Sequence, residues 1–286
     1  MQPNRRLHLA AALLGCVCAL TVVAAGQTNY ATHVEEYSNA ANIHQNPGDG
    51  SNGWYWMADS DSACCVNTTN TSSYTVANPS LDGTSRLFYV DFTPDSATGN
   101  PGERYSTNFG TTPRNFGVSE NATHFAYEAY IYLVDPENVA NIEMDINQVW
   151  NSNDDVLIYG LQCAGVDGRW EYTINDPMKP NYTKWVKDTN PVISCNPANW
   201  GANTWHHVQL TMHQDVMGGV YYDSITLDGT TTPLSSWFGN SSFSFSPPWT
   251  PTGNLALNFQ LDGVNKGAGN EVTITAYVDS LLLSYW

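Results

Sequence analysis

The amino-acid sequence predicts an all-β protein built as an antiparallel two-sheet β-sandwich. After residue 27, no apolar pattern with a helical period and capping residues continues for more than about two turns. Segments rich in β-branched and aromatic residues follow one another instead, and Gly, Pro, Asn and Asp separate them. Short strands at this spacing are typical of sandwiches, in which two sheets bury their apolar faces against each other.

The expected strands follow in chain order. The first is SRLFYVDF at residues 85–92, whereas the polar stretch NTTNTSSYT before it, residues 67–75, predicts a loop. Each later strand combines apolar residues with β-formers and ends at turn-forming residues. These later strands are expected at residues 124–134, 141–150, 155–163, 205–213, 219–229, 254–263 and 272–286.

Three connections between these strands have distinctive sequences. Residues 151–155, NSNDD, are expected to turn one strand into the next, and Asp228-Gly229 is expected to form a tight turn. Residues 167–203 carry several tryptophans and prolines with little alternation. We therefore expect this segment to form long loops tied down by a disulfide.

The N-terminus resembles a secretory signal peptide. Two arginines precede an apolar run that ends in the small residues Ala-Ala-Gly at residues 24–26. A membrane anchor is the alternative interpretation, but the small-residue end of the run favours cleavage. We therefore expect a signal peptide at residues 1–26 and an extracellular protein.

The remaining residues, 27–286, are expected to form a single domain. They contain no internal repeat and no linker, and their length suits one sandwich. No later apolar run is long enough to span a bilayer, so we expect no membrane insertion.

The charge balance excludes one class of partner. The chain has 27 acidic and 10 basic residues, a formal net charge of −17 at pH 7. This charge repels phosphate backbones, so we expect no nucleic-acid partner. Only 13% of the residues are charged, so the surface must consist mainly of neutral polar and aromatic side chains, which suit a polysaccharide.

Four cysteines remain after the expected cleavage: Cys64, Cys65, Cys163 and Cys195. We expect Cys163 to pair with Cys195, because disulfides form in the oxidising environment outside the cell. The adjacent Cys64 and Cys65 are left with three alternatives: a vicinal disulfide, a metal site or free thiols.

Polar side chains alternate with apolar ones along two of the expected strands. Glu143, Asp145 and Asn147 lie on one face of the first strand, opposite an apolar face. On residues 254–263 the polar face consists of Asn258, Gln260 and Asp262. If the two strands lie in one sheet, these carboxylates and carboxamides form a trough that can exchange paired hydrogen bonds with sugar hydroxyls. The alternative is a merely solvated face.

Aromatic side chains are expected to complete such a site, because sugar rings stack on apolar plates. The candidate sugar-stacking residues are Tyr159, Trp170, Trp185 and Trp200.

Several of these segments resemble known families. EMDINQ, residues 143–148, resembles the E-x-D-x-x-E strand of the retaining β-glucanases of glycoside hydrolase family sixteen. TWHHVQLTM and the following DSITLDGT resemble the laminin-G-like and concanavalin A-like lectin pattern, and AYVDSLLLSYW is similar to the closing strand of such jelly rolls. Residues from about 40 onward also resemble a group of secreted bacterial proteins of unestablished activity.

The glucanase resemblance implies roles for three residues. Glu143 would be the nucleophile and Asp145 the carboxylate that positions it, while Gln148 stands where the general acid/base is expected. An amide cannot exchange the required proton, so another carboxylate would have to substitute for it. The candidates are Glu128, Asp154, Asp155 and Asp262.

Three functions follow from this reasoning. The first is a secreted, lectin-like protein that binds a polysaccharide, a β-linked glucan or a related glycan, in a concave sheet groove. The second is a retaining endo-β-glycanase with a non-standard acid/base. The third is an extracellular matrix or envelope protein.

No cofactor is expected, and a structural calcium ion is the one alternative. His206 and His207 point to opposite faces of one strand, so they cannot share a metal ion, and we expect one to be packed and the other to lie on the surface.

Overall fold

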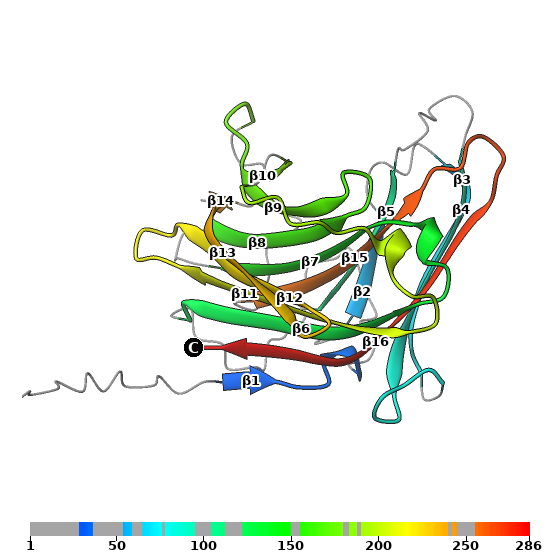
Figure 1. The fold of residues 1–286 in the computed structure, drawn as a ribbon, viewed down its shortest axis with the longest axis horizontal. Coiled ribbons are helices and arrows are strands. Elements are labelled where there is room, and N and C mark those ends of the chain that lie inside the picture. The colour runs from blue at the N-terminus through cyan, green and yellow to red at the C-terminus, as the bar shows by residue number, and fades with distance from the viewer. Residues whose placement is uncertain are drawn as a thin grey trace, which may run out of the picture.

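The computed structural model describes residues 29–36, 54–58, 65–75, 78–94, 104–111, 122–149, 155–179, 183–187, 190–239, 242–244 and 255–286. The expected signal peptide, Cys64, Asp154 and most of the expected turn at 151–155 lie outside these residues. In the described part of the chain, two antiparallel sheets pack face to face (Figure 1). The helices among the described residues are short 3₁₀ turns, and none has the length and apolar character needed to cross a bilayer.

Sheet A has the strand order β13-β12-β11-β6-β16-β4-β3, and β1 pairs with β16 off this path. Figure 1 shows β1 beside β16 and the C-terminus. The bounds are β1 Asn29–Ala31, β3 Cys65–Thr75, β4 Ser85–Pro94, β6 His124–Leu133, β11 Trp205–Gln214, β12 Val220–Leu227, β13 Thr230–Phe238 and β16 Val272–Tyr285. The 3₁₀ turn η1, Val34–Glu36, follows β1.

Sheet B has the order β10-β9-β8-β7-β15-β5-β2, and β14 pairs with β8 off this path. The bounds are β2 Trp54–Ala58, β5 Arg104–Thr111, β7 Val139–Val149, β8 Asp155–Ala164, β9 Arg169–Asn175, β10 Thr183–Val186, β14 Ser242–Ser244 and β15 Leu255–Val264. The turns η4, Pro136–Asn138, and η5, Pro197–Asn199, lie in the connections before β7 and before β11.

The predicted sandwich and its eight predicted strands are confirmed, but two predicted loops are wrong. Residues 67–75 belong to β3, which lies at the end of sheet A and, in the described part of the chain, pairs with β4 alone. Thr has a high β-propensity, and polar residues are common in edge strands because they discourage pairing with another chain. Within the predicted loop at 167–203, residues 169–175 and 183–186 form β9 and β10.

The core lies between the sheets and explains the alternation of the central strands. Every second residue of β6 is buried, and Phe125 of this strand packs 5.1 Å from Tyr159 of β8, measured between ring centroids. Phe88 of β4 meets Phe259 of β15 at 4.8 Å. Each such side chain contributes roughly 1.5–3 kcal/mol by burial.

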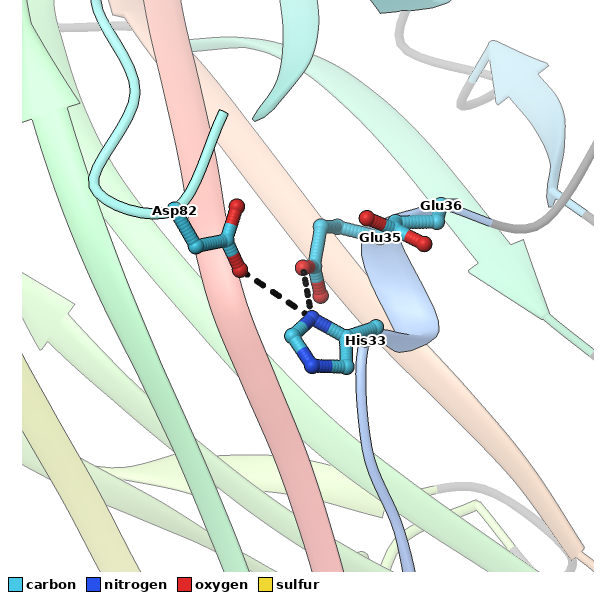
Figure 2. Close-up of side chains that lie close together, drawn as sticks. All are labelled: His33, Glu35, Glu36 and Asp82. Atoms are coloured by element: carbon cyan, nitrogen blue, oxygen red, sulfur yellow. Dashed lines mark ion pairs between the residues drawn. The ribbon is translucent and has the colours of Figure 1, made fainter. Parts of the chain in front are cut away.

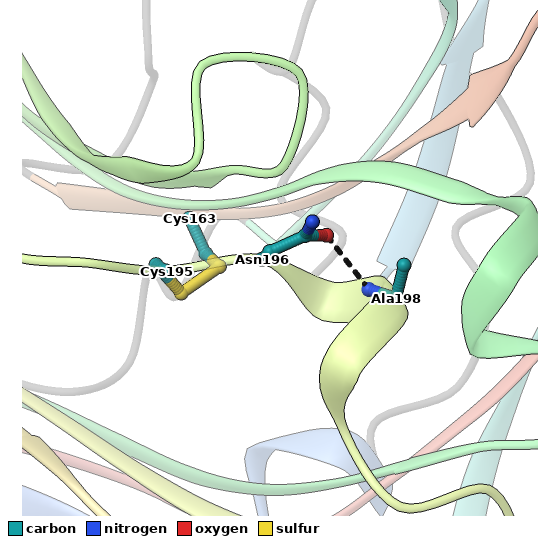
Figure 3. The surroundings of a disulfide bond; sticks show 4 residues. All are labelled: Cys163, Cys195, Asn196 and Ala198. Carbon is teal, nitrogen blue, oxygen red and sulfur yellow. Dashed lines mark hydrogen bonds between the residues drawn. A yellow bond between two sulfur atoms is a disulfide. The ribbon is translucent and has the colours of Figure 1, made fainter.

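Two local predictions are confirmed. Cys163 of β8 forms the disulfide with Cys195, with a Cα–Cα distance of 5.3 Å (Figure 3). Directly after it, the Asn196 side chain accepts a hydrogen bond of 3.0 Å from the Ala198 amide and caps η5. Asp228 and Gly229, with φ of 48° and 78°, form the two-residue turn between β12 and β13.

Candidate functional site

The two polar strand faces predicted from the sequence adjoin each other. β7 and β15 are paired so that Asp145 lies opposite Asn258 and Glu143 lies opposite Gln260. Because Met144, Ile146, Leu257 and Phe259 of the same strands point into the core, these polar side chains lie on the outer side of sheet B.

β8 and β9 extend the polar face beyond the two predicted strands. Gln162 of β8 lies opposite Glu143, and Glu171 of β9 lies opposite Gln162. A row of carboxylates and carboxamides therefore crosses four neighbouring strands. We call the polar face of sheet B the set Asn141, Glu143, Asp145, Asn147, Gln162, Glu171, Asn258, Gln260 and Asp262.

Hydrogen bonds fix the orientation of several of these side chains. The Gln162 Nε2 donates to Glu171 Oε2 at 2.8 Å. Asp262 accepts from Asn141 Nδ2 and from Gln260 Nε2, both at 2.8 Å. The polar face therefore contains two hydrogen-bonded groups, one on β8 and β9 and one on β7 and β15, rather than a row of independently solvated side chains.

Several buried atoms of the polar face have no hydrogen-bond partner. Among the described residues, they include Asn141 Oδ1, Asp145 Oδ1, Asn147 Nδ2, Gln162 Oε1, Glu171 Oε1 and Asn258 Oδ1. Each of these side chains is at most 9% exposed. An unsatisfied buried polar atom costs about 1–3 kcal/mol, so a concentration of such atoms on one face indicates a place where a ligand or water bonds.

Two carboxyl groups of the polar face have raised pKa values. Burial raises the pKa of Asp145 to about 6, although hydrogen bonds from the Glu143 side chain and the Leu161 amide lower it. Burial, and after it a hydrogen bond to Asp167, raises the pKa of Glu171 to about 7. A cation or a hydrogen-bond donor placed beside either carboxyl group would stabilise its ionised form and lower its pKa.

Tyrosines of sheet A hold the strands beneath this face. Tyr222 of β12 accepts a hydrogen bond from the Gly160 amide and donates to the Thr173 carbonyl, each at 3.2 Å. It thus joins β8 and β9 where their ladder ends. Gly160 is required there, because a Cβ would lie 2.6 Å from Thr173 Cγ2 and 3.0 Å from Asp145 Oδ1. The Tyr127 hydroxyl donates to the Asn258 carbonyl at 3.2 Å.

Three of the four predicted sugar-stacking residues are in the wrong place for that role. Tyr159 and Trp170 are 0% and 2% exposed within the core, and Trp200 is 8% exposed and packs against His206. Strand alternation turns the first two toward sheet A, so a sugar cannot reach their rings. Trp185 of β10 is half-buried and lies opposite Thr173, at the side of the polar face.

Gln148 also lies away from the polar face. β7 pairs with β8 and with β15 without a bulge between residues 141 and 148, so residues five apart point to opposite sides. The Gln148 side chain is fully buried, donates to the Ala122 carbonyl and accepts from the Tyr159 hydroxyl. The residue on the same side as Glu143 and Asp145 is Asn147, which is also an amide.

The other candidates for an acid/base differ in position. Glu128 is excluded, because it lies on β6 in sheet A and binds His207 Nε2 at 2.7 Å. Asp262 belongs to the polar face, whereas only the backbone of Asp155 is described. Glu171 was not among the predicted site residues, although the Asp167-Gly168 turn between β8 and β9 is a recognisable hairpin signal.

His206 and His207 bind different carboxylates, as their opposite orientations predicted. His206 Nδ1 lies 2.8 Å from Asp228 Oδ2, whereas His207 stacks on Tyr130. Neither side chain is fully buried, so the prediction that one of them is packed is only partly right.

A different cluster of possible metal ligands lies near the N-terminus, beside sheet A (Figure 2). Ligand atoms of His33, Glu35, Glu36 and Asp82 all lie within 4.8 Å of one another. His33 Nδ1 is 3.1 Å from Asp82 Oδ2 and 3.6 Å from Glu35 Oε1. Oxygen ligands of this kind suit calcium, and the imidazole suits a transition metal. The calcium ion considered from the sequence stays a prediction.

Comparisons with known proteins give distant structural similarity only. No family model matches the sequence, and no curated protein matches it. An alginate lyase of family PL-14 from Aplysia kurodai is 10% identical, with a TM-score of 0.43 over 77% of this chain and 89% of that one. A family 7 alginate lyase, A1-II', is 12% identical, with a TM-score of 0.36 over 74% and 83%. A candidate sugar-binding protein from Bacteroides thetaiotaomicron is 12% identical, with a TM-score of 0.37 over 87% and 95%. These low TM-scores carry no argument about the function of this chain.

Proposed function

We propose that this chain is a secreted protein that binds a polysaccharide, a β-linked glucan or a related glycan, on the polar face of sheet B. The observation that carries the proposal is the concentration of unbonded, buried side-chain atoms on this face. Amide and carboxylate groups are the ones that form paired hydrogen bonds with sugar hydroxyls. Four adjoining strands place these groups in register. Glu143, which is partly exposed, and Asn258 and Gln260, which are 9% and 8% exposed, are the members that a ligand meets first.

Affinity electrophoresis against a panel of soluble polysaccharides tests this proposal. We expect at least one glycan to retard the wild-type protein, and Asn258→Ala combined with Gln260→Ala to abolish the retardation. Asn199→Ala, at an exposed position in η5, is the matched control and should bind normally. A folded protein that no glycan retards would contradict the proposal and favour a matrix or envelope role.

Hydrolysis is a second candidate, which one contact favours: the Asp145 side chain hydrogen-bonds to Glu143, as expected of a residue that positions a nucleophile. Glu171 is the carboxyl group on the same face whose pKa of about 7 suits an acid at neutral pH. Its backbone lies two strands from that of Glu143, or about 9–10 Å away. The carboxyl groups of a retaining pair are about 5 Å apart and those of an inverting pair about 6.5–9.5 Å apart. The spacing therefore favours an inverting reaction over the retaining one.

A reducing-end assay on β-linked glucans, with Glu143→Gln and Glu171→Gln, tests the second candidate. Both variants should lose activity if the two carboxyl groups act together. Activity that survives both substitutions would exclude this pair, and the absence of wild-type activity on every bound glycan would leave binding as the function.

A further inference from the structure

Five of the six unbonded atoms of the polar face are oxygens, and the sixth is Asn147 Nδ2. An ionised carboxylate oxygen only accepts hydrogen bonds, which makes Asp145 Oδ1 and Glu171 Oε1 acceptors whenever the two groups are ionised. The amide nitrogens of Asn141 and Gln162 already donate to Asp262 and Glu171, so the atoms left over are oxygens. These four atoms, the unbonded oxygens of Asn141, Asp145, Gln162 and Glu171, are therefore hydrogen-bond acceptors. A complementary ligand must therefore mainly donate hydrogen bonds.

The charge of this face points in the same direction. Glu143, Asp145, Glu171 and Asp262 place four carboxyl groups on adjoining strands. Among the described residues, Arg169 and Lys187 are the basic side chains near Glu171, and both have other partners, although the charge of Lys187 also lowers the pKa of Glu171. Arg169 donates to the Lys187 and Asp167 carbonyls at 2.6 and 3.3 Å, and Lys187 Nζ pairs with Asp167 at 3.1 Å.

Three classes of glycan can be compared with this surface. A polyuronate would place its own carboxylates beside the acceptor oxygens of the polar face, and the like charges would repel each other. The formal net charge of −17 adds to this repulsion. A neutral glucan donates hydroxyl hydrogens without charge. An amino sugar offers an ammonium group with three donors, and charge-assisted hydrogen bonds are about twice as strong as neutral ones.

We propose that the ligand of the polar face is a cationic glycan, a β-linked polymer of glucosamine with free amino groups. Its ammonium groups donate to the acceptors of β7, β8 and β9, and its hydroxyls bond to the carboxamides of Asn258 and Gln260 on β15. This inference rests on the proposed function and narrows its ligand. The raised pKa values of Asp145 and Glu171 are consistent with it, because a bound cation would favour their ionised forms.

Isothermal titration with β-1,4-linked oligomers of equal length tests the proposal at about pH 7, above the pKa of about 6 of Asp145, where part of the amine is still charged. The oligomers are built from glucosamine, N-acetylglucosamine, glucose or a hexuronic acid, so the backbone is constant and the substituents change. We expect glucosamine oligomers to bind at least about tenfold more tightly than glucose oligomers. This advantage should shrink at high salt, which screens charges.

Variants separate the polar face from the overall charge. Asp145→Asn and Asp223→Asn each remove one negative charge, but Asp223 lies on β12 in sheet A, where it binds His213. Only Asp145→Asn should weaken glucosamine binding several-fold. Asn258→Asp adds a charge to the polar face at nearly constant shape, and should raise the ratio of glucosamine affinity to glucose affinity.

The possible outcomes distinguish this inference from the function on which it rests. Glucose oligomers that bind as tightly as glucosamine oligomers would overturn the cationic ligand and leave polysaccharide binding intact. Equal weakening by the Asp145 and Asp223 variants would reduce the interaction to attraction by net charge, and would also overturn it. If no oligomer of any class binds, both proposals fail.

Discussion

Glu35 links the stability of this fold to pH. Its side chain is 0% exposed, and its two carboxylate oxygens accept hydrogen bonds from the Ser280 and Leu281 amides of β16 at 3.1 and 2.8 Å. Burial raises its pKa to about 7, and Asp279 adds to the shift, while the backbone hydrogen bonds and His33 oppose it. The native protein therefore holds a proton on Glu35 that the unfolded chain releases above its ordinary pKa of 4.5.

The sign of the effect follows from this proton. Below pH 4.5 both states are protonated and the contribution to stability is complete. As the pH rises toward about 7, the unfolded state alone has lost its proton, so the free energy of unfolding falls. A shift of this size corresponds to about 3 kcal/mol, because one pKa unit is worth about 1.4 kcal/mol.

Glu35→Gln removes this titration at nearly constant shape. Urea unfolding at several pH values between 4.5 and 8 should show that the variant loses about 3 kcal/mol less stability than the wild type over this range. Asp145 and Glu171 titrate in both proteins, so the difference isolates Glu35. The loss of one amide hydrogen bond, about 1 kcal/mol, shifts the variant curve equally at every pH. Parallel curves would refute the buried-proton explanation.

Three further predictions concern single contacts. Cys163→Ala with Cys195→Ala opens a loop of 32 residues and should lower the free energy of unfolding by about 3–4 kcal/mol, and reducing the native disulfide should cause the same loss. Gly160→Ala forces a Cβ against Thr173 and Asp145, so it should destabilise the fold by about 1–3 kcal/mol and also weaken glycan binding. Gly263→Ala places its Cβ against Phe92 in the core and should destabilise comparably in urea without changing the affinity of the folded protein.

The strands that alternate clearly could be predicted from the sequence because burial decides their pattern. β6, β11 and β16 bury almost every second residue, so an apolar period of two was visible in each. β3 was missed because it is polar, and pairing with β4 rather than burial marks it as a strand. β9 was missed although RWEYTI alternates, because the neighbouring tryptophans and prolines suggested a loop.

For the candidate site, the sequence predicted which side chains of one strand share a face, but not which strands lie next to each other. Alternation placed Glu143, Asp145 and Asn258 on polar faces, and the pairing of β7 with β15 confirmed the condition that these faces adjoin. That condition was not readable from the sequence, because a long crossover separates the two strands along the chain. The prediction of sugar-stacking aromatic residues failed for Trp170 because this residue belongs to β9, where its position in the strand turns its side chain into the core.

Glu171 illustrates why the chemistry of such a face depends on register more than on residue types. A shift of β9 by one residue would turn Glu171 into the core and Trp170 outward, exchanging an acceptor for an apolar plate. The turn at Asp167-Gly168 and the Cys163–Cys195 disulfide hold β9 in the register that places Glu171 opposite Gln162. A hydrogen bond between these two side chains then leaves an oxygen of each without a partner, and under the proposed function these two acceptors favour a ligand that donates.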